Sequence, residues 1–128
     1  MLTVKYPDGG GAMGVGDRPW HMLDEILDSV VKLELLLFFH SNPAAMDSAE
    51  GLSIWLGRDA ERIRQAADEL VEATILDRWG EGENAIYCYT SNPQVRSMIS
   101  DFVDSELTSK EKRDMLFREL LQREASRQ

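Results

Sequence analysis

The stretch Asp47–Thr90, DSAEGLSIWLGRDAERIRQAADELVEATILDRWGEGENAIYCYT, decides the fold. It opens with DSAE, an N-cap signal followed by an acidic residue, and its next apolar residues share one helical face. Gly57 then provides a turn. Apolar residues at helical spacing continue beyond that turn: Ala60, Ile63, Ala66, Ala67 and Leu70. The pattern predicts two helices, over 48–56 and 59–72.

Two short strand-like segments follow the second helix. Residues 75–79 and 85–90 are rich in apolar and aromatic side chains, and the glycine-containing sequence GEGEN separates them. A glycine-rich tip between two such segments is typical of an antiparallel hairpin. We therefore predict one hairpin after residue 73.

Helical patterns also flank this central stretch. Before it, the spacing of apolar residues predicts one helix over 20–41, which Asn42-Pro43 ends. After it, Asn92-Pro93 is a cap followed by a first-turn proline and predicts a helix over 93–105. The sequence TSKE at 108–111 matches a capping box and predicts a last helix over 109–125.

The first helix carries the apolar run LLLFF at 35–39. A helix that is apolar on every side is buried on every side. A small three-helix core can cover part of this run, and we expect a partner chain or the C-terminal helix to cover the rest. The apolar stripe of the last helix adds to the apolar surface available for association. We therefore predict a homodimer. Its expected contact residues are Leu36, Phe38, Phe39, Leu116 and Leu120.

The order of these elements resembles the winged helix-turn-helix domains of bacterial and archaeal transcriptional regulators, such as those of the MarR type. The resemblance rests on KLELLLFF at 32–39, LSIWLGRDAERIR at 52–64 and LVEATILDR at 70–78. It implies a mainly α fold with a small β-hairpin, followed by two C-terminal helices. The expected organisation is a glycine-rich tail over 1–18, a winged-helix domain over 19–106 and a dimerisation helix over 107–128.

The resemblance also implies double-stranded DNA as a partner, because the second helix of this motif usually enters the major groove. Side chains on the exposed face of that helix would then contact phosphates and base edges, with Arg suited to guanine, Gln to adenine and Glu to cytosine. The wing would lie alongside, with an arginine at its base. The expected DNA-binding residues are Arg58, Glu61, Arg62, Gln65 and Arg78.

The charge distribution favours a different partner. The chain has a net charge of −9, and residues 44–90 hold four basic and ten acidic side chains. DNA-binding proteins usually have a basic surface, because neutralised phosphates supply most of the non-specific affinity. The alternative function is therefore a winged-helix module that binds a protein and not DNA. A surface that gathers the arginines favours DNA, whereas carboxylates that dilute them favour the protein partner.

Other classes of function have no positive signal. The single cysteine, Cys88, cannot form a disulfide within the chain, and His21 and His40 lie too far apart on one predicted helix to share a metal. The chain lacks a glycine-rich phosphate loop, a nucleophile elbow and a zinc-ligand spacing. We expect no enzyme activity, catalytic residue, metal or cofactor. We also expect no membrane span or signal peptide, and a cytoplasmic location.

Overall fold

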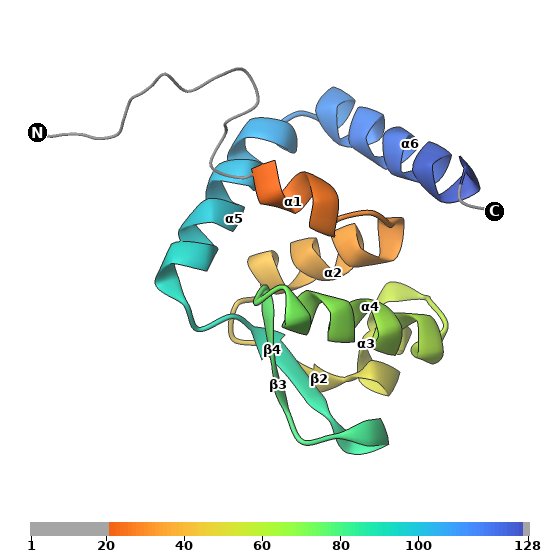
Figure 1. Cartoon of the computed structure of the whole chain (residues 1–128), viewed down its shortest axis with the longest axis vertical. Helices are drawn as coiled ribbons and strands as arrows, with labels where there is room; N and C mark the ends of the chain where they lie inside the picture. The colour runs from red at the N-terminus through yellow and green to blue at the C-terminus, as the bar shows by residue number, and fades with distance from the viewer. Residues whose placement is uncertain (1–20, 127–128) are drawn as a thin grey trace, which may run out of the picture.

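The structure is a computed structural model that describes residues 21–126, apart from the side chains of His21, Met22 and Asp24. Its elements are, in chain order, α1 (His21–Ile26), α2 (Val30–Ser41), β2 (Met46–Ser48), α3 (Ala49–Leu56), α4 (Ala60–Glu72), β3 (Leu76–Trp79), the 3₁₀ turn η1 (Gly82–Asn84), β4 (Ile86–Tyr89), α5 (Pro93–Glu106) and α6 (Lys110–Ser126). Figure 1 shows the sheet at the lower end of the molecule and α6 at the opposite end. The predicted tail over 1–18 lies outside the described residues.

The predicted fold class is confirmed. The chain is a winged helix, with three helices, α2 to α4, packed on a small antiparallel sheet and two further helices at the C-terminal end. The caps expected from sequence are present, because Ser48 accepts a hydrogen bond from the Gly51 N–H at 3.2 Å and Asn92 accepts bonds from the first turn of α5.

The prediction of one helix over 20–41 was wrong, because this segment forms two helices, α1 and α2. Ser29 adopts an extended conformation, and its hydroxyl accepts a hydrogen bond from the Lys32 N–H at 3.2 Å. A serine that caps a helix starts that helix afresh, so α2 begins at Val30. Apolar periodicity alone continues across such a break, since Leu27 and Val31 are both buried.

The sheet has three strands and not the two of the predicted hairpin. Its order is β2-β4-β3, with Met46 paired to Cys88 and Asp77 paired to the other side of Cys88. Strand β2 has only three residues, which is too short for an alternating pattern to show. It lies directly before α3, so Ser48 both ends the strand and caps the helix.

The core lies between α2, α4, α5 and the sheet. Fully buried side chains come from each of these elements: Leu33, Leu35, Leu36, Phe39, Ile63, Leu70, Tyr87, Ile99 and Phe102. Helix α6 packs against α2, where Leu120 is buried and the Glu124 carboxylate accepts a hydrogen bond from the Val30 N–H at 3.5 Å. Within the LLLFF run, the chain's own core buries Leu35, Leu36 and Phe39, whereas Leu37 and Phe38 are only partly buried.

The turn between α4 and β3 holds a strained residue. Thr74 has a φ of 67°, a left-handed conformation that its β-branched side chain disfavours. Glycine adopts this conformation without steric cost. We expect Thr74→Gly to raise the free energy of unfolding by about 1 kcal/mol, as measured by urea denaturation. The matched control is Thr108→Gly in the turn before α6, where φ is not positive and the added freedom should lower stability. A loss of stability in Thr74→Gly would contradict the expectation.

Candidate nucleic-acid interface

The helix-turn-helix is built by the three residues between α3 and α4. Gly57 ends α3 in the left-handed conformation with a φ of 67°, and its N–H donates to the Ser53 carbonyl. Asp59 then caps α4, since its carboxylate accepts a hydrogen bond from the Arg62 N–H at 3.1 Å. These two caps fix the angle at which α4, the helix expected to read DNA, leaves the turn.

The outward face of α4 is acidic. The helix buries Ile63, Ala66, Ala67 and Leu70 against the core. With 3.6 residues per turn, the positions directly opposite this buried face are Glu61, Gln65, Asp68 and Glu72, which we call the crest. Three of these four side chains are carboxylates. A duplex that received the crest in its major groove would therefore meet negative charge first.

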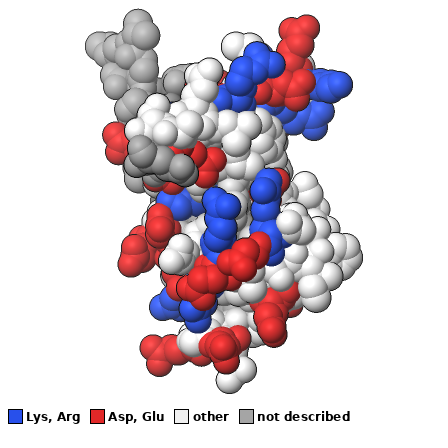
Figure 2. All heavy atoms as spheres, turned by 90° about the vertical axis from the view of Figure 1, so that its right-hand side faces the viewer, with Lys and Arg blue, Asp and Glu red and all other residues white. Residues whose placement is uncertain are grey.

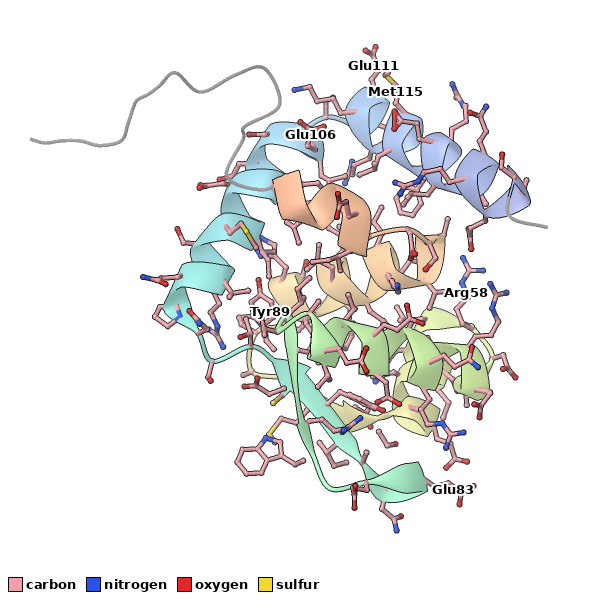
Figure 3. The ribbon with its side chains drawn as sticks, in the orientation of Figure 1. Arg58, Glu83, Tyr89, Glu106, Glu111 and Met115 are labelled. Atoms are coloured by element: carbon pink, nitrogen blue, oxygen red, sulfur yellow. The ribbon has the colours of Figure 1, made fainter. Side chains whose placement is uncertain are left out.

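Arg58 is held away from the crest by an ion pair with α2. Its guanidinium donates two hydrogen bonds to the Glu34 carboxylate, at 2.9 Å from Nε and 3.0 Å from Nη2. This bidentate pairing raises the pKa of Arg58 above its ordinary value. Figure 3 shows Arg58 beyond the right-hand end of α4. A phosphate that accepted from the remaining N–H groups of Arg58 would lie close to the Glu34 carboxylate and be repelled by it.

Two further arginines pair with carboxylates of the crest. Arg64 donates a hydrogen bond to Glu61, one turn before it on α4. Arg78, at the base of the wing, donates to Asp68 Oδ1 at 2.8 Å, and the buried Tyr87 hydroxyl donates to the same oxygen at 2.6 Å. The hydrogen bond from each arginine raises its pKa. From the sequence, Arg78 could pair either with a glutamate of the wing or with DNA. In the structure it pairs with Asp68 of α4.

Arg62 and Gln65 are the most available of the expected DNA contacts. The Arg62 side chain is 61% exposed, and its nearest carboxylate, Glu124 of α6, is 3.9 Å away. Gln65 is exposed beside it. Both residues line a shallow pocket with the start of α2, on the side of α4 away from the wing. The structure therefore places Arg62 on the flank of α4 that faces α6, next to the crest and not on it.

Lys32 is a site residue that the sequence analysis did not single out. Its side chain is buried under α4, where its ammonium contacts Asp28 at 2.8 Å and also Glu69. Burial lowers the pKa of Lys32, but hydrogen bonds and charge from the two carboxylates outweigh it, so the pKa is raised. A lysine within the apolar sequence VVKLELLLFF was the available signal. This cation ties α2 to α4 and is not available to a phosphate.

The wing adds more negative charge. Glu81 and Glu83 are exposed, and Figure 3 shows Glu83 at the tip of the wing. Figure 2, which looks onto the right-hand side of Figure 1, shows basic and acidic side chains interleaved over this face, with no continuous basic surface. The carboxylates thus dilute the arginines, which is the arrangement expected for a protein partner.

The expected dimer contacts fall into two groups. Leu36, Phe39 and Leu120 are buried within the single chain, which corrects the expectation that a partner covers them. Phe38 and Leu116 are partly buried against the same core, and dimerisation through them stays a prediction. Within residues 21–126, no three His, Cys, Asp or Glu side chains are placed to hold a metal ion. Nor does any helix of that range have the length and apolar character to cross a membrane.

A comparison with solved structures finds a structural neighbour of low sequence identity. No protein family and no curated protein matches the chain. Among solved structures, the chain is similar to a possible transcriptional regulator from Methanosarcina mazei Go1, with a TM-score of 0.49 and 22% sequence identity. The similarity covers 78% of this chain and 87% of that one. That name describes the Methanosarcina mazei protein.

Proposed function

We propose that this winged helix is a protein-interaction module that uses its helix-turn-helix face to bind another protein and not duplex DNA. The observation that carries the proposal is the crest of α4, where Glu61, Asp68 and Glu72 occupy the positions that would enter the major groove. The whole chain has a net charge of −9, so the long-range field also repels a duplex.

The ion pairs strengthen this argument. Arg58, Arg64 and Arg78 each already donate a hydrogen bond to a carboxylate. A phosphate that accepted from their remaining N–H groups would lie close to that carboxylate and be repelled by it. The attraction of each arginine for a phosphate is thus offset in part by the repulsion from its partner. The electrostatic gain that normally drives non-specific DNA binding is therefore reduced.

The second candidate is a DNA-binding transcriptional regulator, which the exposure of Arg62 beside Gln65 favours. In this case binding depends on a few base contacts and little on phosphates. Arg62→Ala should then cost about 1–3 kcal/mol on the true site, if Arg62 makes a bidentate contact to guanine. The salt dependence of binding should be shallow, because few phosphates are neutralised.

Titration of labelled genomic DNA fragments separates the two candidates. We expect the wild-type protein to give no saturable fluorescence anisotropy change at low salt. The double variant Glu61→Lys/Glu72→Lys should bind the same fragments, because it replaces repulsion with attraction on the crest. The matched control Glu111→Lys/Asp114→Lys makes the same change in net charge on exposed positions of α6.

The control variant should bind DNA at least about tenfold more weakly than the crest variant, since its new charges lie far from α4. Equal binding by the two variants would show that net charge, and not the crest, keeps DNA away. Tight binding of one fragment by the wild type, lost in Arg62→Ala, would overturn the proposal in favour of the DNA-binding regulator.

A further inference from the structure

Helix α3 presents two large apolar side chains to solvent. Ile54 is 83% exposed and Trp55 is 71% exposed, although the same helix buries Leu52 completely. The Trp55 ring contacts Phe38 of α2 in a tilted arrangement, with the ring centroids 6.4 Å apart. Adjacent exposed apolar residues of this size are unusual on a monomer surface, and tryptophan is enriched at the centres of protein interfaces. We call Ile54 and Trp55 the ridge.

An acid-lined pocket lies next to the ridge. It has a volume of about 290 Å³ and is bounded by the first turns of α3 and α4 and by the tip of the wing. Its charged lining consists of Glu50, Glu61, Glu83 and Arg64. Arg64 pairs with Glu61, whereas Glu50 and Glu83 have no ion-pair partner among residues 21–126. Two uncompensated carboxylates therefore face one pocket, which favours a cation as occupant.

Ile54 connects the pocket to the ridge. Glu50 and Ile54 are four residues apart on α3, so their side chains are neighbours on the same face of the helix. Trp55 lies about 100° further round α3, on the side of Phe38. A segment that runs from the pocket along α3 therefore meets Ile54 first and Trp55 beyond it. Such a partner needs a positive charge and an apolar side chain within a few residues of each other.

We propose that this surface binds a short basic and apolar segment of another protein. A lysine or arginine of that segment enters the pocket between Glu50 and Glu83, and an adjacent apolar side chain packs on Ile54 and Trp55. The inference rests on the proposed function and specifies the chemistry of the partner. The charge of the pocket selects against an acidic segment, and the apolar ridge selects against a purely basic one.

Selection from a random peptide library displayed on phage tests this inference on the full chain. We expect enriched peptides to combine Lys or Arg with Leu, Phe or Trp. One enriched peptide is then synthesised with a fluorescent label, and its dissociation constant is measured by anisotropy. Enrichment of acidic peptides, or of apolar peptides without basic residues, would overturn the inference.

Substitutions then locate the binding surface. Trp55→Ser and the double variant Glu50→Gln/Glu83→Gln should each weaken binding of the enriched peptide by at least about tenfold. The matched controls are Trp79→Ser, which removes a tryptophan that is 64% exposed elsewhere, and Glu111→Gln on α6. Both controls should bind within about twofold of the wild type. Circular dichroism of every variant establishes that it is folded.

The remaining outcomes are decisive as well. Binding that is unchanged in Trp55→Ser would place the peptide elsewhere and overturn the inference. A wild type that sediments as a dimer, together with a monomeric Trp55→Ser, would show that a second copy of the chain covers the ridge, which also overturns it. Failure of the inference is distinguishable from failure of the proposed function, because DNA binding that depends on Arg62 is measured without the peptide.

Discussion

Replacing Phe39 with alanine should lower the free energy of unfolding by about 3–5 kcal/mol, because it removes a fully buried ring and leaves a cavity. Phe39 lies in the last turns of α2, and its ring meets that of Phe38 edge-on at 5.1 Å between centroids. Helices α2 and α4, which both bury residues in this core, pack against each other. A loss of this size is a large part of the stability of a domain of this length, and urea denaturation followed by far-UV circular dichroism measures it.

Phe38→Ala is the matched control. Phe38 is only partly buried, so its replacement should cost clearly less, about 1–2 kcal/mol. Because Phe39 is fully buried within one chain, the loss caused by Phe39→Ala should be the same at every protein concentration. A loss that changes steeply with protein concentration would show that a second chain completes this core. Equal losses in the two variants would contradict the burial difference between the rings.

The helices after residue 48 could be predicted from the sequence because their signals are local. Ser48, Asp59 and Asn92 cap the first turns of α3, α4 and α5. Each accepts a hydrogen bond from an N–H group that lies at most three residues further along the chain. The apolar spacing then fixes the face that each helix buries. For these three helices the observed bounds agree with the predicted ones to within one residue at each end.

Features that depend on distant contacts could not be predicted in this way. Strand β2 exists because Met46–Ser48 lies beside β4, about forty residues further along the chain. The LLLFF run required a cover, but its periodicity could not decide between a second chain and α6. The break at Ser29 was locally signalled, since serine is a strong cap, yet the buried residues on both sides concealed it.

In the candidate interface, too, the features that depend on distant contacts could not be predicted from the sequence. The sequence identifies the arginines near α4 and shows that carboxylates outnumber them, which raises the alternative of a protein partner. It cannot show that Arg58 pairs with Glu34, 24 residues before it, or that Arg78 pairs with Asp68. Those pairs form only when α2, α4 and the wing come together. The charge of the segment was therefore readable from the sequence, whereas the availability of each arginine was not.

The protein should lose stability steeply as the pH rises above 10, and Tyr87 should account for much of that loss. Burial raises the pKa of the Tyr87 hydroxyl to about 12 from its ordinary 10.0, and its hydrogen bond to Asp68 and the charge of Asp68 act in the same direction. Between these two pH values the unfolded chain has released the proton and the folded chain still holds it. The stabilisation is fully present below pH 10 and is lost by about pH 12, at a total of about 2 kcal/mol.

Tyr87→Phe isolates this contribution, because it keeps the ring and removes the titrating hydroxyl. At neutral pH the variant should be less stable than the wild type by about 1 kcal/mol, the usual net worth of one hydrogen bond. As the pH rises from 10 to 12, this difference should shrink and then reverse, since only the wild type carries the ionising group. Urea denaturation at a series of pH values measures the crossing, and near-ultraviolet tyrosinate absorbance follows the ionisation directly.

Tyr89→Phe is the control for this pH series. Burial also raises the pKa of Tyr89, but the charge of Arg96 opposes the shift, and the guanidinium lies 4.8 Å from the ring centroid. Replacing Tyr89 should therefore change the loss of unfolding free energy above pH 10 less than Tyr87→Phe does.

Lys32 contributes in the same pH range. Because its pKa is raised in the folded chain, its charged form stabilises the fold below pH 10.5, and this stabilisation is lost at higher pH. Some alkaline loss should consequently persist in both variants. Parallel profiles for the wild type and Tyr87→Phe would mean that Tyr87 ionises as freely in the fold as in the unfolded chain, and that the Tyr87–Asp68–Arg78 cluster does not hold the base of the wing to α4.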